Sequence, residues 1–426
     1  MNRARVLGDA VRVCKIRDTV DSGGYKVSPW RGLWFVLAVY AASRLFYLAA
    51  GTVLVGVVPI GSFQQQTEDV PFGTINLWGH WDGEHYARLA SNGYLEPPNN
   101  VSPAFFPLYP LLIRSFAELF GGPVSLGALS LWGVLISLAV LPLAFYFVYR
   151  ITEDGWGTRA AQGAVLALAF FPTSFFLNAA YTESLFLALS AGALWAARVR
   201  RDLLLAALFA GLATATRNVG VFLFLPLAYE WLRNAGEYRW RGLYLALAPS
   251  GLVAYMGYLW YRFGDPLLFY TDQADWGREA TSPLATMENI WSRAHGGVER
   301  VLEPGAFVGT PYPGRLMLYL DALLNTYNLL FLLLAVGLVV LGAAVWRVLP
   351  LGLAGYALLL TVAPAFFGTE SVPLMGMPRY VLVAFPLFIV LGVLLGDRRL
   401  LAGWVAASAA LSLVFVSLFV GWWFVA

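Results

Sequence analysis

Long apolar runs dominate the chain, and short polar stretches separate them. A helix needs about 20 apolar residues to cross a bilayer, and strand-length alternation of apolar and polar positions is absent. The pattern predicts an all-α polytopic membrane protein with about 11 transmembrane helices, since only helices and closed barrels can span lipid. The predicted spans are 32–58, 124–149, 160–177, 184–199, 203–216, 218–230, 242–262, 326–346, 349–366, 380–395 and 401–425.

The apolar run over residues 203–230 decides the topology. Arg217 and Asn218 divide it into two short pieces, which we interpret as two helices turning at Arg217. The alternative is one long tilted helix, which would reverse the side of every later loop. With the break, the short arginine-rich loops share one side with the N-terminus, and loops 59–123 and 263–325 lie on the other. Short arginine-rich loops face the cytoplasm, so we expect a cytoplasmic N-terminus and outer or lumenal long loops.

The composition agrees with this class. Hydrophobic residues make up 59% of 426 positions and charged residues only 12%, against about 25% charged residues in soluble domains. Residues 1–29 are basic and are expected to form a cytoplasmic segment, either a surface helix or a disordered tail. Residues 30–426 are expected to form a single multi-span domain in the cell membrane, or in the endoplasmic reticulum of a eukaryote. The small net charge of +3 gives no reason to expect a nucleic-acid partner.

One polar stretch, residues 78–94, follows the first predicted span. Four other polar groups, in 178–183, 217–218, 264–278 and 379–380, fall on the same outer side under the favoured topology. Charged groups within or beside spans are costly and mark functional sites by default. This convergence predicts a site at the outer side.

The residue types indicate transfer of a sugar from a lipid phosphate to a hydroxyl group. A carboxylate near the bilayer suits general-base catalysis, which we assign to Asp82. Arginine forks match phosphate oxygens, and we assign Arg217 and Arg379 to the donor phosphate, with Tyr380 beside them and Glu183 orienting one arginine. In the alternative interpretations, Asp82 caps a helix that starts at Gly83, and the arginines are interfacial anchors.

The other candidates are expected to contact substrate. Glu84 has either a catalytic role or a supporting one. His80 and His85 flank the carboxylates, but their spacing matches no tight zinc motif, so no metal or cofactor is expected and a divalent metal stays open as the alternative. The substrate-contact candidates are His80, Trp81, His85, Asn178, Tyr181, Glu183, Gln273, Trp276 and Arg278.

Several blocks of the sequence resemble the PIG-V family, which comprises GPI mannosyltransferase 2 and its prokaryotic relatives. The first block, His-Trp-Asp-Gly-Glu-His-Tyr at 80–86 with Leu89-Ala90 and Gly93-Tyr94, is similar to the signature of the family's first loop. The later blocks follow in family order: 105–110, 171–174 with 179–184, 215–218 with Gly220, 264–266 with Gln273 and Trp276, and 378–380.

The resemblance implies a GT-C-like fold and a glycosyltransferase that uses a polyprenyl-phosphate sugar and inverts the anomeric configuration. It implies that the catalytic carboxylate of the first outer loop is Asp82, that the sugar is mannose and that no metal is needed. The acceptor is expected to be a hydroxyl of a glycolipid or glycan. The competing hypothesis is a lipid or solute transporter, which would need polar residues along a path to the cytoplasm and often shows repeated halves.

Overall fold

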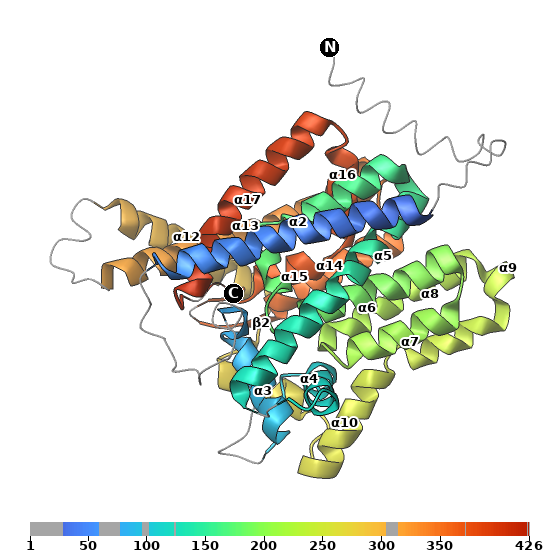
Figure 1. The fold of residues 1–426 in the computed structure, drawn as a ribbon, viewed down its shortest axis with the longest axis horizontal. Helices are drawn as coiled ribbons and strands as arrows, with labels where there is room; N and C mark the ends of the chain where they lie inside the picture. The colour runs from blue at the N-terminus through green and yellow to red at the C-terminus, as the bar shows by residue number, and fades with distance from the viewer. Residues whose placement is uncertain are drawn as a thin grey trace.

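The computed structural model describes residues 29–58, 77–95, 102–122, 125–303, 314–370, 372–423 and 425. The described part consists of helices with one pair of two-residue strands (Figure 1). The basic segment predicted for residues 1–29 lies outside the described residues, apart from Pro29, where the first helix begins. This helical architecture confirms the all-α prediction.

Five helices in the described ranges are long and apolar enough to cross a membrane. A sixth span results if α15 (Met377–Val383) and α16 (Pro386–Leu394), which are bent by 74° at their junction, are taken together. The expected number of 11 is therefore not confirmed, although a multi-pass membrane protein is. The five are α2 (Pro29–Val55), α5 (Leu126–Ala169), the segment Ala235–Phe263 that ends with α10 (Ser250–Phe263), the segment Ala322–Val345 that includes most of α13 (Gly314–Val340), and α17 (Arg398–Val420).

The count is lower partly because α5 enters it as one element. Its 44 residues comprise two helices that meet at a kink at Gly157, whose φ of 84° and ψ of 168° are not helical. The two predicted spans 124–149 and 160–177 therefore correspond to the two parts of α5, the second of which ends at Ala169. Apolar helices of 10–17 residues, Leu203–Thr214 and Leu351–Phe366, occupy two more predicted spans.

Arg217 separates two helices, as the sequence predicts. The first is α7 (Leu203–Thr214), and α8 (Phe224–Arg233) follows after the short 3₁₀ segment η5 (Asn218–Leu223). Arg217 itself has extended backbone, with φ −152° and ψ 139°. The two helices run side by side with α6 (Glu183–Trp195), so the single long helix is excluded (Figure 1). The turn leaves Arg217 beside the N-terminus of α6.

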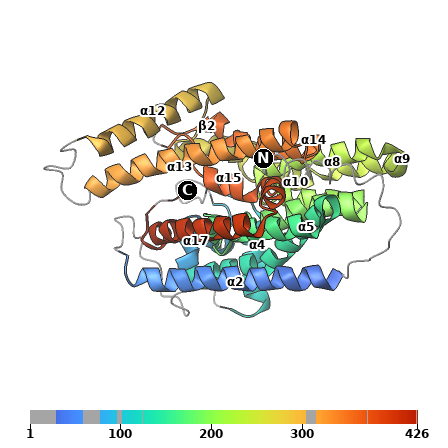
Figure 2. The same ribbon diagram turned by 90° about the horizontal axis from the view of Figure 1, so that it is seen from above.

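The segments around the site come from the two long loops. The first loop forms α3 (Asp82–Asn92) and α4 (Leu108–Leu119). Residues 104–120 of this loop are apolar but too short and interrupted to span a bilayer, a pattern that predicts an interfacial helix, and α4 lies within them. The second loop contains α12 (Pro283–Leu302), which lies beside α13 at one edge of the molecule (Figure 2). Its strand β1 (Glu279–Ala280) pairs antiparallel with β2 (Phe367–Gly368) and so joins this loop to the loop before α15.

The remaining elements connect these helices. They are η3 (Ser174–Leu177), η4 (Ala196–Arg200), α9 (Ala235–Tyr238), η6 (Arg239–Leu247), α11 (Leu268–Thr271), η7 (Asp272–Trp276), η8 (Leu341–Val345), α14 (Leu351–Val362) and η9 (Ala363–Phe366).

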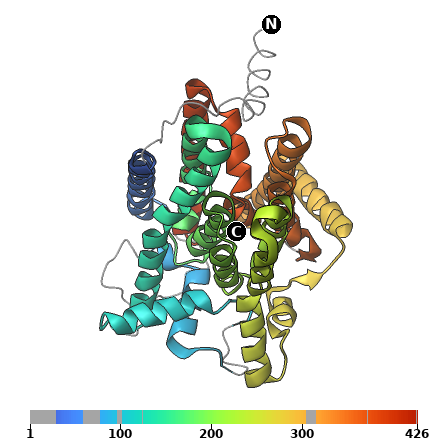
Figure 3. The ribbon, with the colours of Figure 1, turned by 90° about the vertical axis from the view of Figure 1, so that its right-hand side faces the viewer.

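The core lies around α5 and α6, where small residues allow close packing. A Cβ atom on Gly163 of α5 would lie 2.9 Å from the carbonyl oxygen of Gly392 in α16, so the two backbones touch. Such contacts between small residues are how membrane helices gain packing energy without a hydrophobic driving force. By contrast, α2 is at the edge of the molecule, where Figure 3 shows it nearly end on in blue.

Candidate active site

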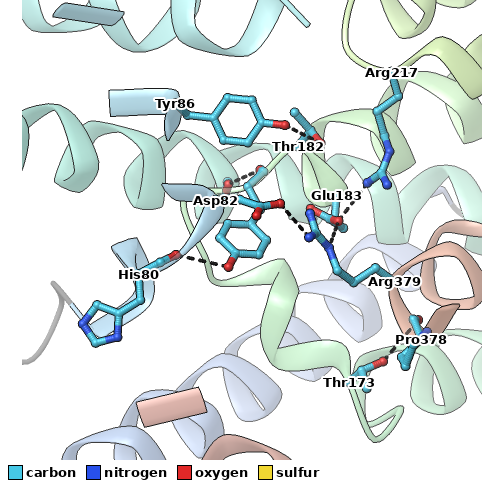
Figure 4. Close-up of polar contacts among 11 residues, drawn as sticks. His80, Asp82, Tyr86, Thr173, Thr182, Glu183, Arg217, Pro378 and Arg379 are labelled. Atoms are coloured by element: carbon cyan, nitrogen blue, oxygen red, sulfur yellow. Dashed lines mark hydrogen bonds and ion pairs between the residues drawn. The ribbon is translucent and has the colours of Figure 1, made fainter. Parts of the chain in front are cut away.

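Four charged side chains form one continuous chain of ion pairs. Arg379 donates from Nη1 to Asp82 Oδ2 at 2.6 Å and from Nε to Glu183 Oε1 at 2.6 Å (Figure 4). Arg217 donates from Nη1 to the same Glu183 oxygen at 2.8 Å. The exposed fraction is 0% for Glu183 and 27% for Asp82, so Asp82 is the carboxylate that remains accessible. Glu183, which was expected to orient one arginine, contacts both.

Asp82 reaches this chain because it is the first residue of α3. The N-cap is Trp81, so Asp82 does not cap a helix starting at Gly83, and that alternative is wrong. Trp81 has φ 58° and ψ −119°, a backbone conformation that is strained for a residue with a side chain. Gly83 follows close to Ala180, whose backbone N–H donates to the carbonyl of Trp78 at 2.8 Å. These contacts fix the start of α3 against the loop before Glu183.

Aromatic rings support the two arginines. The Arg379 guanidinium lies 4.6 Å from the ring centre of Tyr181, and the Arg217 guanidinium lies 5.4 Å from that of Tyr380. The hydroxyl of Tyr181 donates to the carbonyl of His80 at 3.1 Å. Tyr181 is thus a buried support beneath Arg379, and it links the α3 loop to the loop before α6.

A buried arginine of α2 makes a second hydrogen-bond network, with the segment between α5 and α6. Arg44 of α2 donates to the carbonyls of Ala169 and Ser174 at 3.0 and 3.1 Å and to Asn178 Oδ1 at 2.6 Å. It also donates to the hydroxyls of Ser43 and Ser174. Asn178, expected to contact substrate, is buried in this network and does not line the cavity described next. Arg44 therefore stabilises the segment that carries Glu183.

A cavity of about 360 Å³ opens beside Asp82. Its polar wall contains seven of the expected site residues: Asp82, Arg217, Gln273, Trp276, Arg278, Arg379 and Tyr380. Its apolar wall includes Phe105, Phe106, Val221, Phe222, Leu252 and Met375. Arg278 donates to Gln273 Oε1 at 3.4 Å and has no ion pair with a carboxylate in the described part of the chain. The wall is therefore positively charged overall.

The structure adds residues that sequence reasoning missed. Tyr86, Thr182, Thr216 and Asn218 also line the cavity. Tyr86 is in the same polar stretch as Asp82, one helical turn later, and that i, i+4 spacing could have identified it. Thr182 and Thr216 immediately precede Glu183 and Arg217, but nothing in their sequence context distinguishes them from other threonines.

The two histidines pack against aromatic rings. The His80 ring stacks on Trp422 with 3.8 Å between ring centres, and it points away from Asp82 in Figure 4. The His85 ring stacks on Phe105 at 4.9 Å and meets Trp276 edge to face at 5.1 Å. Burial lowers the pKa of His80 to about 3, and burial also lowers the pKa of His85. Both therefore act as neutral aromatic packing groups at neutral pH.

Glu84 and Trp81 also lie outside the cavity lining. Burial raises the pKa of Glu84, although nearby Arg88 opposes the shift. Trp81 packs 6.0 Å from Trp422 between ring centres. Within the described ranges, no group of three or more His, Cys, Asp or Glu side chains is close enough to hold a metal ion.

Comparison with known proteins agrees with the expected resemblance. Residues 30–232 match the family model described as mannosyltransferase (PIG-V). GPI mannosyltransferase 2 of Drosophila pseudoobscura pseudoobscura is 36% identical over 115 residues, which is 25% of this chain and 24% of that protein. GPI alpha-1,6-mannosyltransferase 2 of Mus musculus is 33% identical over 172 residues, or 39% of this chain and 33% of that protein. The matches thus span a quarter to a third of these relatives' length.

Two solved structures are among those to which the chain is similar at low superposition scores. The oligosaccharyltransferase of Archaeoglobus fulgidus superposes with a TM-score of 0.46 at 15% identity, covering 89% of this chain and 53% of that one. ArnT of Cupriavidus metallidurans, solved with undecaprenyl phosphate, gives a TM-score of 0.38 at 14% identity, covering 87% and 77%.

The matched segment contains most of the ion-pair chain described above. Asp82, Glu183 and Arg217 are inside it, whereas Arg379 is outside. Residues 30–232 match the PIG-V mannosyltransferase family, which confirms the resemblance seen in the sequence.

Proposed function

We propose that this chain is an integral membrane mannosyltransferase that uses a polyprenyl-phosphate mannose donor. The acceptor would be a hydroxyl group of a glycolipid or glycan on the outer or lumenal side. The observation that carries the proposal is one cavity that contains an accessible carboxylate, Asp82, and three arginines, Arg217, Arg278 and Arg379. The family match of residues 30–232 supports the choice of mannose.

Asp82 would act as the general base. Its Oδ2 is held by Arg379, and no hydrogen bond to its Oδ1 is present among the residues that the structure describes. That second oxygen would take the proton of the acceptor hydroxyl as the hydroxyl oxygen attacks the anomeric carbon. The bond from the anomeric carbon to the phosphate oxygen breaks, and its electron pair leaves with the lipid phosphate.

The three arginines would stabilise the leaving phosphate. Arg217 and Arg379 share Glu183, so each keeps donor atoms that are not used in the ion-pair chain. Arg278 adds a positive charge that has no carboxylate partner among the described residues. Charge that develops on the phosphate in the transition state is then met by donors already fixed in position, which lowers the barrier.

The set of carboxylates favours inversion. Asp82 is the one carboxylate among the described residues that line the cavity. Retention by two displacements needs a second carboxylate as nucleophile, placed a few ångströms from the first, as in retaining glycosidases. A single displacement at the anomeric carbon inverts its configuration.

The competing transporter hypothesis finds no support in α6. Between Glu183 and Trp195 this helix is apolar apart from Ser184 and Ser190, and its residues from Glu183 to Leu194 are buried. The polar groups therefore do not continue along this helix towards its other end.

The test is transfer of radiolabelled mannose from synthetic polyprenyl-phosphate mannose into membrane lipid extract by the purified full chain. We expect transfer with the wild type and at least about 100-fold less with Asp82→Asn, which keeps the shape and removes the base. Glu84→Gln is the second arm, because a loss confined to that variant would move the base to Glu84. No transfer by the wild type from this donor would contradict the proposal.

A further inference from the structure

A second polar cavity, of about 330 Å³, lies at the other end of the helices that carry the candidate site. Its wall contains three arginines, Arg198, Arg201 and Arg233, and two carboxylates, Asp154 and Glu230. Arg198 is in η4, which continues α6, Arg201 is in the turn between η4 and α7, and Arg233 ends α8. The candidate active site uses none of these residues.

The two cavities are on opposite sides of the helical bundle. Fifteen positions separate Glu183 from Arg198 along α6 and η4, and at 1.5 Å per residue they span roughly 22 Å. The return helix α7 covers the same distance from Asp202 to Arg217. This is a large part of the ~30 Å hydrocarbon core of a bilayer. Figure 1 shows α9, next to the second cavity, far from α3.

Arg198 supplies a buried cationic group that is incompletely paired. Its side chain is 8% exposed, and its Nη1 lies 3.5 Å from Glu230 Oε1 as an ion pair. This Nη1 is buried and makes no hydrogen bond within the part of the chain that the structure describes. A buried donor without a hydrogen bond costs about 1–3 kcal/mol. A ligand oxygen in the cavity could accept a hydrogen bond from this Nη1 and remove that cost.

The two other arginines are placed at the mouth. Arg201 pairs with Glu237 at 2.7 Å and is 61% exposed. It has left-handed backbone, φ 56° and ψ 38°, at a helix C-terminus where glycine is usual. Arg233 is exposed and has no carboxylate partner in the described ranges. Arg198 at the base and two arginines at the rim can surround one anion.

We propose that this cavity binds the phosphate of an anionic lipid headgroup at the membrane surface opposite to Asp82. The guanidinium fork matches phosphate oxygens. Apolar side chains within five positions of cavity-lining residues are exposed: Leu232 is 64% exposed, Trp240 63% and Leu243 75%. A phosphate that is attached to a lipid would reach the arginines while its acyl chains cover these side chains. The arginine-rich loops place this surface on the cytoplasmic side.

The test measures thermal unfolding of the purified full chain in neutral detergent, with three additions at equal ionic strength: short-chain phosphatidylglycerol, phosphatidylcholine of the same chain length, and inorganic phosphate. The double variant Arg201→Gln, Arg233→Gln removes the rim charges. The matched control, Arg200→Gln, Arg241→Gln, removes the same charge from exposed residues outside the cavity. Arg233→Gln alone serves if the double variant does not fold.

We expect phosphatidylglycerol to raise the wild-type Tm and to bind at least about tenfold more weakly to the rim variant, with binding to the control unchanged. An equal effect of inorganic phosphate, lost in the same variant, would support the anion site and identify free phosphate as a sufficient ligand. No stabilisation by either ligand would overturn the proposal, as would an equal loss in the rim and control variants. Mannosyl transfer is not measured, so failure here is separate from failure of the proposed function.

Discussion

Asp82 and Arg379 are 297 positions apart in the sequence, and Arg379 Nη1 lies 2.6 Å from Asp82 Oδ2 in the structure. The pairing orients the carboxylate of Asp82 towards the cavity, and it also positions Arg379, which contacts Glu183 through a different nitrogen. The proposed base and the proposed phosphate-binding group are therefore in direct contact. Moving either one changes the other.

Arg379→Lys is expected to reduce transfer about 100-fold, the usual effect of losing one group that stabilises transition-state charge. A lysine ammonium is a point charge and cannot bridge Asp82 and Glu183 with a planar fork. The measurement is steady-state transfer at several donor concentrations. Arg241→Lys, at an exposed residue that lines neither cavity, is the control. Equal kcat/KM values for Arg379→Lys and the wild type would remove Arg379 from the mechanism.

Glu183→Gln is expected to destabilise the protein by about 3 kcal/mol, because it leaves two arginines whose side chains are only 13% and 11% exposed without their common carboxylate. Thermal unfolding in detergent measures the loss. Added polyprenyl phosphate should recover part of the Tm, since its phosphate would supply a negative charge to the same arginines. A variant as stable as the wild type would show that Glu183 is not the counterion that the geometry indicates.

Arg44→Met is expected to lower the Tm without changing the KM for the donor in the folded fraction. The substitution leaves buried acceptors, among them the carbonyls of Ala169 and Ser174, without hydrogen bonds, and each such group costs about 1–3 kcal/mol. Unfolding curves and donor titrations of one preparation separate the two effects. A changed KM at unchanged Tm would mean that Arg44 acts on substrate and not on the fold.

His85→Phe is expected to reduce the sensitivity of the fold to acid. Burial lowers the pKa of His85, with Asp82 partly opposing the shift. Below the ordinary value of about 6.5, the unfolded chain binds a proton that the folded chain does not, so this contribution to stability is present above that pH and lost as the pH falls.

Phenylalanine keeps the ring that packs on Phe105 and removes the titration. The drop in Tm between pH 7.5 and pH 5.5 should be smaller in the variant than in the wild type. His80 remains in the variant, with its folded-state pKa lowered to about 3. Between pH 7.5 and 5.5 only the unfolded chain protonates His80, which accounts for a remaining drop in Tm. Identical drops in the two proteins would contradict the assignment to His85.

The sequence by itself determined the class of the protein and most of the site's components. Apolar runs and the scarcity of charge require helices in lipid, because each backbone polar group must be satisfied within its own helix. Arg217 and Arg379 stood out because charged groups near spans are costly, and Asp82 stood out as a carboxylate in the polar stretch after the first span. The sequence also predicted the break at Arg217, since the distribution of arginine-rich loops favours two short helices over one long tilted helix.

Only the tertiary structure decided how these residues are used. His80 and His85 flank Asp82 in the sequence, but their rings turn to Trp422 and Phe105. Asn178 lies five positions before Glu183, but its Oδ1 accepts a hydrogen bond from Arg44 and its side chain does not line the cavity. Contacts between residues far apart along the chain depend on how the helices pack, and local pattern carries no information about that. Only the tertiary structure decided the ion-pair chain from Asp82 to Arg217, because its four members come from separate segments that meet only in the folded protein.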